Sequence, residues 1–147
     1  MKLTPLLFLG LLTSLGTADD APPEPVAQWT LSSASRNRSA NGTTCHWGLT
    51  IRDDASGMPA EHCHFTVKAD ASKPCNLVQF SDIPCAAESD WVMNGGFSEF
   101  QQFMVVIVYN AREQAKAYFG FQSRALDEGK PIPKQINPAF STNQSNH

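Results

Sequence analysis

The sequence predicts an all-β protein, a single-domain antiparallel β-sandwich or small β-barrel of about seven strands with two disulfides. Apolar and polar residues alternate with period two along much of the chain, and Gly, Pro, Asn and Asp separate the alternating stretches. All four cysteines lie beyond the N-terminal apolar segment. Alternation of this kind is typical of half-buried antiparallel strands, because successive side chains of a strand point to opposite faces.

The N-terminal segment is predicted to be a signal peptide. Lys2 supplies a positive start, Leu6–Leu12 is a short apolar run, and Gly16 and Ala18 form the small-x-small pattern that signal peptidase reads. We expect cleavage after Ala18, so that residues 1–18 are removed and the mature chain is secreted. An uncleaved membrane anchor is the alternative, which the short apolar run disfavours. We expect no membrane association after cleavage.

The remaining chain is expected to hold one domain, at residues 27–140. Residues 19–26 are acidic and rich in proline and are interpreted as a disordered leader, and residues 141–147 as a disordered polar tail. A formal net charge of −3 without a basic cluster disfavours nucleic acid as a partner. A hydrophobic content of 41% disfavours a wholly disordered protein.

The strands are assigned from these patterns in chain order. They are predicted at residues 27–33, 45–51, 63–69, 76–81, 90–94, 103–110 and 115–122. The first three alternate most strictly, and their inward faces are expected to carry Trp29, Leu31, Cys45, Trp47, Leu49, Ile51, Cys63, Phe65, Val67 and Ala69.

The prediction of the later strands depends on residue composition as well as on alternation. Residues 103–110 are a nearly continuous β-branched run, which indicates a central strand buried on both faces. Residues 111–119 are the ambiguous segment, because Asn110 could cap a helix there. We favour a strand returning from a turn at residues 110–113, since residues 118–121 alternate around a glycine.

Cysteine and histidine are adjacent at Cys45-His46 and at His62-Cys63-His64. Neighbouring side chains in a strand point to opposite faces, so a cysteine and the histidine beside it cannot easily share a metal ion. The three histidines are interpreted as surface residues, with a weak pH- or metal-sensitive patch as the alternative. A catalytic Cys/His pair needs a free thiol, and none is spare. No metal site and no cofactor is predicted.

The cysteines are instead expected to pair in disulfides, as an even number in an exported chain indicates. If the second and third strands form a hairpin with Ile51 near Cys63, then Cys45 lies roughly 20 Å from Cys63, beyond the reach of a disulfide. Cys75 follows the third strand and falls near Cys45, and the next strand returns Cys85 towards Cys63. The sequence therefore predicts Cys45–Cys75 and Cys63–Cys85.

Two kinds of surface site are also predicted. Asn37, Asn41 and Asn143 begin Asn-x-Ser/Thr sequons, which indicates a glycoprotein, and the first two predict a surface loop over residues 36–44. Among the tryptophans, Trp91 lies beside Asn-Gly-Gly and is the one expected to be exposed. An exposed indole could stack on a ligand, which makes a secreted carbohydrate- or small-ligand-binding module the alternative function.

The stretches "CHFTVKA" and "SDIPC" resemble the β-barrel family of the major Alternaria allergen and its plant-response elicitor relatives, over about residues 48–121. This resemblance implies a secreted fungal effector, elicitor or allergen-like role. It also implies a disulfide between neighbouring strands at Cys63 and Cys85. It supplies no catalytic residues.

The acidic residues do not form a recognisable catalytic motif. They are scattered near predicted turns, and solvated loop charges are a better interpretation than a glycosidase pair; these residues are Glu61, Asp82, Glu88, Asp90 and Glu99. The chain also lacks the Gly-x-Ser-x-Gly and His-Glu-x-x-His motifs. We therefore expect a secreted, non-enzymatic interaction protein whose partner is an extracellular protein or glycan.

Overall fold

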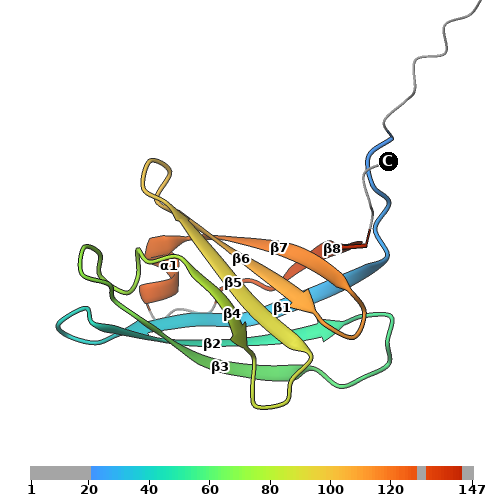
Figure 1. Cartoon of the computed structure of the whole chain (residues 1–147), viewed down its shortest axis with the longest axis horizontal. Helices are drawn as coiled ribbons and strands as arrows, with labels where there is room; N and C mark the ends of the chain where they lie inside the picture. Colours follow the sequence, from blue (N-terminus) through green and yellow to red (C-terminus); the bar gives the residue numbers. More distant parts are fainter. Residues whose placement is uncertain (1–20, 129–131, 144–147) are drawn as a thin grey trace, which may run out of the picture.

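The computed structural model describes residues 21–128 and 132–143 and contains eight antiparallel strands and one short helix in that part of the chain (Figure 1). The strands are β1 (Ala27–Arg38), β2 (Thr44–Asp53), β3 (Glu61–Lys68), β4 (Phe80–Pro84), β5 (Trp91–Ser98), β6 (Phe103–Asn110), β7 (Ala115–Gln122) and β8 (Gln135–Ser141). The helix α1 (Ser123–Asp127) follows β7. No described helix is long and apolar enough to cross a membrane. The predicted all-β fold class is confirmed.

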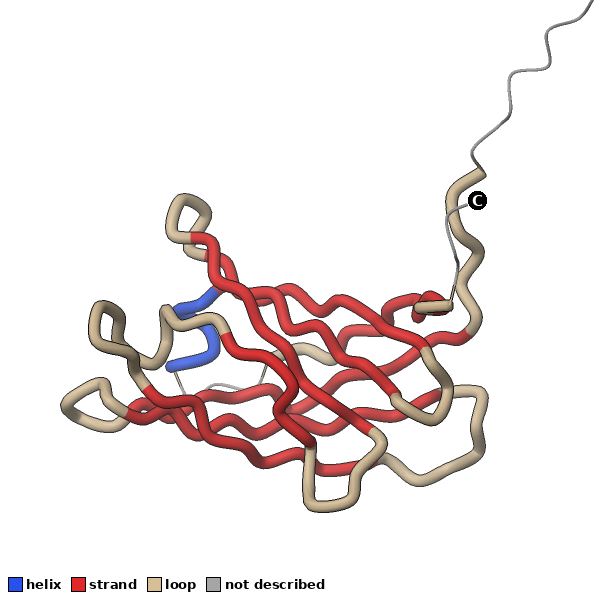
Figure 2. Tube along the Cα trace, in the orientation of Figure 1, coloured by secondary structure: helices blue, strands red, loops and turns tan. Residues whose placement is uncertain are grey.

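The strands form one sheet in the order β3-β2-β1-β8-β7-β6-β5-β4. The sheet curls until its edge strands β3 and β4 approach each other, which gives a nearly closed barrel (Figure 2). A disulfide joins Cys63 of β3 to Cys85, which directly follows β4. This bond fastens the seam of the barrel and limits the opening of two strand edges that could otherwise pair with other chains.

The loops lie at the two ends of the barrel. The β1–β2, β3–β4 and β5–β6 loops gather at one end together with α1, and the β2–β3, β4–β5 and β6–β7 loops lie at the opposite end (Figures 1 and 2). We call the first the Phe100 end, after a residue of its β5–β6 loop, and the second the cleft end.

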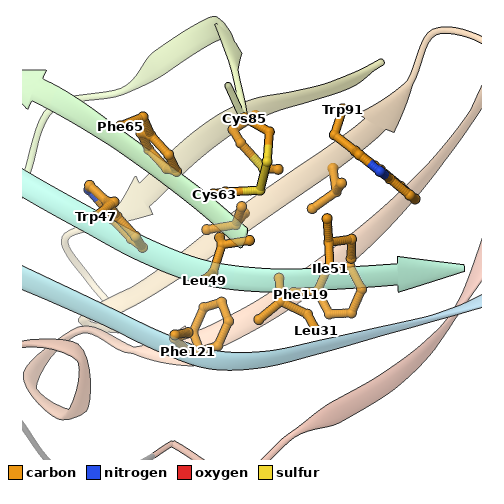
Figure 3. Packing of buried hydrophobic residues seen from close by; sticks show 14 of the residues in the cluster. Leu31, Trp47, Leu49, Ile51, Cys63, Phe65, Cys85, Trp91, Phe119 and Phe121 are labelled. Carbon is orange, nitrogen blue, oxygen red and sulfur yellow. A yellow bond between two sulfur atoms is a disulfide. The ribbon is translucent and has the colours of Figure 1, made fainter. Parts of the chain in front are cut away.

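One hydrophobic core fills the barrel, and aromatic side chains from different strands meet in it (Figure 3). Trp47 stacks on Phe65 with ring centroids 5.7 Å apart, and Trp29 meets Trp91 edge to face at 4.8 Å. All side chains predicted to face inward on the first three strands are buried, except the half-buried Ala69. An eight-stranded barrel is narrow enough to be filled by side chains in this way.

The register of the β2–β3 hairpin differs by two residues from the predicted one. Ile51 lies opposite Glu61 rather than Cys63, and Cys45 lies opposite Val67. Because the side-chain period of a strand is two, this shift leaves every residue on its predicted face. The structure contains the disulfides Cys45–Cys75 and Cys63–Cys85, with Cα atoms 5.5 and 4.5 Å apart, which is the pairing that the sequence predicted.

Three strand predictions need correction. β1 continues to Arg38, so the predicted surface loop over residues 36–44 is shortened to residues 39–43. β4 begins at Phe80 rather than at residue 76, because the amide of Leu77 bonds back to Pro74 in a turn. β6 is not buried on both faces: its residues alternate between buried and half-buried.

The C-terminal part of the fold contains the strands β7 and β8. The strand at Ala115–Gln122 is confirmed against the helical alternative. The strand β8 was not predicted, because Pro138 interrupts its pattern. The backbones of β7 and β8 pair only near Ser141 and Phe140. Further along the two strands, the side-chain amide of Gln135 in β8 donates to the Gly120 carbonyl of β7 at 2.7 Å. A side-chain hydrogen bond therefore joins the strands where their backbones no longer pair.

Candidate functional site

A cleft with a volume of about 210 Å³ lies at the cleft end of the barrel. It is formed where the β2–β3, β4–β5 and β6–β7 loops meet. Four carboxylates line it, together with one arginine, the indole of Trp91 and apolar side chains of the β2–β3 loop; the carboxylates are those of Asp53, Glu61, Asp90 and Glu113. The site is thus acidic at its walls and partly apolar.

Two turns hold its central residues in place. Asp53, the last residue of β2, is buried opposite Trp29, and its Oδ1 accepts a hydrogen bond from the Ala55 amide at 3.0 Å. Asn110, the last residue of β6, is also buried, and its Oδ1 accepts from the amides of residues 112 and 113 at 3.0 and 3.1 Å. This second turn directs Glu113 towards Asp53.

Asp53 and Glu113 both line the cleft, and the Asp53 carboxyl influences the titration of Glu113. Burial raises the pKa of the Glu113 carboxyl above its ordinary value, and the contact with Asp53 raises it further. Arg112 and the indole N–H of Trp29 act in the opposite direction. The Glu113 carboxyl therefore keeps its proton to a higher pH than an isolated glutamate would.

Trp29 lies opposite Asp53 in the β1–β2 pairing. It is fully buried, and its indole N–H has no hydrogen-bond partner of ordinary geometry within the described residues. A buried donor without an acceptor carries a desolvation cost of about 1–3 kcal/mol.

The other charged groups of the cleft have partners. Arg112 forms an ion pair with Asp90, and Glu61 accepts a hydrogen bond from the Ser89 hydroxyl. Arg112 is the only basic side chain among the described residues that line the cleft. Its charge is thus already matched by one of the four carboxylates.

The predicted stacking role of Trp91 rested on its exposure, and that expectation is wrong. Trp91 is 8% exposed, because its indole packs into the core against Trp29 and only a small part of it reaches the cleft. Its position at the start of β5, on the inward-facing side, explains the burial. The Asn-Gly-Gly segment that suggested exposure lies within the strand rather than in a turn.

At the Phe100 end, the sequence did not predict the exposure of Phe100 itself. It is 98% exposed at the tip of the β5–β6 loop. The loop is braced from both sides: the Gln102 side chain donates to the Glu99 carbonyl at 2.7 Å, and Glu99 forms an ion pair with Lys73 of the β3–β4 loop. A large apolar side chain is thus held in solvent by an ordered turn.

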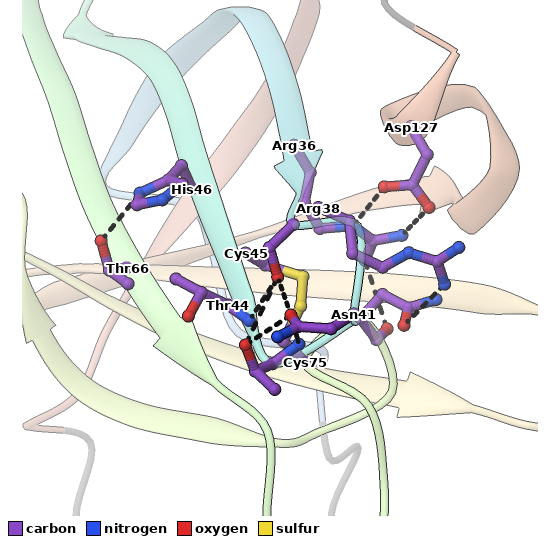
Figure 4. The surroundings of a disulfide bond; sticks show 12 residues. Arg36, Arg38, Asn41, Thr44, Cys45, His46, Thr66, Cys75 and Asp127 are labelled. Carbon is purple, nitrogen blue, oxygen red and sulfur yellow. Dashed lines mark hydrogen bonds and ion pairs between the residues drawn. A yellow bond between two sulfur atoms is a disulfide. The ribbon is translucent and has the colours of Figure 1, made fainter.

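Arg36 was also missed, and it fixes the Phe100 end from inside (Figure 4). The guanidinium is buried, pairs with Asp127 of α1 at 2.8 Å, and lies 5.3 Å from the Trp47 ring centroid. It also donates to the Ser123 hydroxyl and to the Asn76 carbonyl. One side chain therefore ties β1, the helix and the β3–β4 loop together beside the Cys45–Cys75 disulfide.

The sequon asparagines Asn37 and Asn41 are exposed at the Phe100 end. The side-chain Oδ1 of Asn41 accepts hydrogen bonds from the hydroxyls of Thr43 and Ser39, as Figure 4 shows in part. Asn143 is exposed too, but the rest of its sequon lies outside the described residues. Glycosylation at these positions remains a prediction.

The three histidines lie on the outer face of the β2–β3 hairpin, as the alternation predicted. His46 bonds to Thr66, His62 bonds to Thr50, and His64 lies opposite Gly48. Threonine and glycine thus occupy the positions opposite each imidazole. In the described part of the chain, no three side chains of His, Cys, Asp or Glu converge as metal ligands would.

Comparison with known proteins assigns the family. No curated protein matches the chain. The family model described as Effector TSP1 matches residues 30–146, a range that includes nearly all of the barrel and both of its ends. This match supports the effector-like character predicted from the sequence, while the resemblance to the Alternaria allergen family gains no support from it. The chain belongs to the Effector TSP1 family.

Proposed function

We propose that this protein is a secreted fungal effector that acts outside the producing cell by binding a partner protein, without catalysing a reaction. The observation that carries the proposal is the fully exposed Phe100, presented by a braced turn on a disulfide-fastened barrel. The family assignment supplies the effector role. The signal peptide predicted over residues 1–18 supplies the route of export.

The scaffold suits an extracellular setting. Disulfides persist in oxidising compartments, and all four cysteines of this chain are paired. Each bond closes a loop of 22 or 30 residues and contributes about 3 kcal/mol, mainly by restricting the unfolded chain. Such a domain resists unfolding and therefore proteolysis outside the cell.

The Phe100 end has the properties of a binding surface. Aromatic side chains carry a large share of the binding free energy at protein interfaces, and a preorganised loop loses less conformational entropy on binding. The bonds of Gln102 and the Lys73–Glu99 ion pair provide this preorganisation. We expect the partner to be an extracellular protein with an apolar pocket that receives Phe100.

Two observations support this function over its rivals. A glycosidase needs two carboxyls that face the sugar, whereas two of the four cleft carboxylates are already engaged, Asp90 by Arg112 and Glu61 by the Ser89 hydroxyl. The carbohydrate-binding alternative needed an exposed tryptophan platform, and Trp91 is buried. Neither a hydrolase nor a stacking lectin therefore accounts for the geometry as well as a protein-binding loop does.

The experiment measures secretion and binding together. The full-length chain is expressed in a filamentous fungus, the N-terminus of the protein in the medium is sequenced, and the labelled protein is titrated onto intact plant cells. We expect a mature N-terminus after Ala18 and saturable binding that Phe100→Ala weakens at least about tenfold. Tyr118→Ala, a change at an exposed aromatic of β7, is the control and should bind as the wild type does. Retention inside the cell, or equal binding by both variants, would contradict the proposal.

A further inference from the structure

We propose that the outer face of the β2–β3 hairpin binds a carboxylated polysaccharide, and binds it more tightly in acid than at neutral pH. We call this surface the histidine face. It lies on the side wall of the barrel, between the two loop ends (Figure 1), so it does not depend on Phe100 or on the effector role proposed above. Its residues are the outward-facing positions of the two strands, namely Thr44, His46, Gly48, Thr50, Arg52, His62, His64, Thr66 and Lys68.

The alternation of the two strands separates their charges. Both carboxylates of β2 and β3, those of Asp53 and Glu61, occupy inward-facing positions and line the cleft. The outward-facing positions of these strands, which the structure describes in full, carry three histidines, one arginine, one lysine and no carboxylate. Although the whole chain has a formal net charge of −3, the hairpin therefore gathers positive side chains on one face.

The histidines form a continuous row. His62 and His64 are successive outward residues of β3, and His46 lies diagonally across from His64, because its direct partner is Thr66 (Figure 4). Outward side chains in such positions are roughly 7 Å apart. This spacing suits contact with successive groups of one extended chain, whereas the ligands of a metal ion must converge on a point.

A polar hollow of about 200 Å³ adjoins the row. It is lined by two exposed cations, Arg52 and Lys134, and by three hydroxyl side chains. One of these, Thr50, bonds to His62 at 2.8 Å, which connects the hollow to the histidine row. The hollow is on the scale of a single sugar unit, and its cations and hydroxyls match the carboxylate and hydroxyl groups of a uronic acid.

Two carboxylates follow the ends of these strands, and both are engaged. Asp54 accepts from the Thr30 hydroxyl at 2.8 Å and pairs with Arg52 at 2.9 Å. Asp70 accepts from two backbone amides of its own turn at 2.8 and 2.7 Å. The pKa of each carboxyl is lowered, chiefly by the Thr30 hydrogen bond at Asp54 and by the backbone hydrogen bonds at Asp70. Neither carboxylate is thus committed to a histidine, and Lys134 adds a further positive charge beside the Arg52–Asp54 pair.

Protonation of the row should control the affinity. Histidine gains its positive charge as the pH falls from about 8 to about 5, whereas uronic acid carboxylates stay ionised over that range. The neighbouring strands add little titratable charge: β1 places Ser35 and Asn37 opposite Gly48 and His46. Across the seam, β4 contributes Asp82, and no ion pair joins a carboxylate to a histidine in the described part of the chain.

The polar character of the face favours a polysaccharide over a membrane. No outward residue of β2 or β3 is a large apolar side chain that could insert into lipid. Threonine hydroxyls lie among the imidazoles, which suits a polymer that presents hydroxyls between its carboxylates. The outward residues from His62 to Lys68 span roughly 20 Å, the length of several sugar units. Such binding depends on charge rather than on stacking against a tryptophan.

The test is a titration of the secreted, mature protein onto immobilised polygalacturonate at about pH 5 and about pH 7.5, followed by biolayer interferometry. Fully methyl-esterified polygalacturonate, the same chain without its charge, is the control ligand. The Asn37 sequon lies opposite His46, so the protein is first treated with an endoglycosidase. We expect binding at least about tenfold tighter at the lower pH, weakened by added salt, and none to the ester.

The triple variant His46→Gln/His62→Gln/His64→Gln should bind at the lower pH as weakly as the wild type binds at the higher pH. Lys68→Gln should weaken binding at both pH values. Lys116→Gln is its matched control, because it removes the same charge from β7 and should bind as the wild type does. The substituted positions of the histidine face are exposed, so these variants should stay folded, which thermal unfolding curves check.

Four outcomes would overturn the proposal. They are equal affinity of the wild type at the two pH values, an unchanged pH dependence in the triple variant, equal effects of Lys68→Gln and Lys116→Gln, and equal binding of the methyl ester. Tighter binding to vesicles of anionic phospholipid than to polygalacturonate would also overturn it, because that result would assign the face to a membrane surface.

Discussion

Arg36 shows how a single residue can escape prediction and still organise one end of the fold. Trp29 and Leu31 set an inward face of odd-numbered positions on β1. The register then shifts between Ser32 and Ser35, where Ser33 adopts a φ of 55°, and the even-numbered Arg36 turns inward. A β-bulge of this kind leaves no mark in the hydrophobic pattern, so the sequence predicted an exposed loop at Arg36.

The buried guanidinium of Arg36 should be important for stability. We expect Arg36→Ala to lower the free energy of unfolding by about 1–3 kcal/mol, because it leaves the buried hydroxyl and carbonyl of Ser123 without their donor. Urea unfolding followed by tryptophan fluorescence measures the change. Arg38→Ala, two residues further along β1 and exposed, should change it by less than about 1 kcal/mol. Similar midpoints for the two variants would contradict this role of Arg36.

The Glu113 carboxyl predicts a pH dependence of stability with an unusual sign. Its pKa is raised in the folded protein, so the folded chain holds its proton longer than the unfolded chain does. The stability that this proton provides is complete below the unfolded pKa and is lost as the pH rises through the folded pKa. Glu113→Gln should therefore become more stable than the wild type as the pH increases from acidic to neutral.

The same measurement on Glu99 should give the opposite sign. The hydrogen bond and charge of Lys73 lower the pKa of Glu99, so its stabilising effect is present above the unfolded pKa and is lost as the pH falls. Glu99→Gln should accordingly be less stable than the wild type at neutral pH, and the difference should disappear in acid. Thermal unfolding between about pH 3 and pH 8 distinguishes the two, and parallel profiles for both variants would refute the assignment.

At the scale of elements, alternation predicted those strands whose pattern is complete. The strand at Ala115–Gln122 was placed at its observed bounds, and β2 and β3 within a few residues, because one face of each is buried and the other is polar. β4 was misplaced and β8 missed, because a turn and a proline obscure their patterns. The cleft was not predicted at all: its carboxylates come from three separate loops, and only the closure of the barrel brings them together.

Within β5, two adjacent glycines should respond differently to substitution. A Cβ on Gly95 would collide with the ring of Phe80, which packs directly over that glycine, whereas a Cβ on Gly96 would meet no atom within 4 Å. We expect Gly95→Ala to destabilise the protein by about 1–3 kcal/mol through overpacking. Gly96→Ala should be neutral or slightly stabilising. Urea midpoints measure both changes, and equal effects would show that Phe80 can move aside at little cost.

For the whole molecule, the two disulfides have different structural roles despite similar loop lengths. Their sequence separations of 30 and 22 residues predict contributions that differ by only about 0.3 kcal/mol in the chain-entropy description. Cys45–Cys75 anchors the β3–β4 loop to β2 at the Phe100 end. Cys63–Cys85 joins the two edge strands, where β3 and β4 make few other contacts. The first bond therefore secures a loop, and the second secures the closure of the barrel.

Removing each bond separately should reveal this difference. We expect the double variants Cys63→Ala/Cys85→Ala and Cys45→Ala/Cys75→Ala to lose similar amounts of stability, about 3 kcal/mol each. Only the first should accelerate amide hydrogen exchange along β3 and β4, because opening the seam leaves these edge strands free to separate from the sheet. The central strands β6 and β7, which pair along their whole lengths, should keep their protection in both variants. If exchange in β3 and β4 rises equally in the two variants, the seam is held by core packing rather than by the Cys63–Cys85 bond.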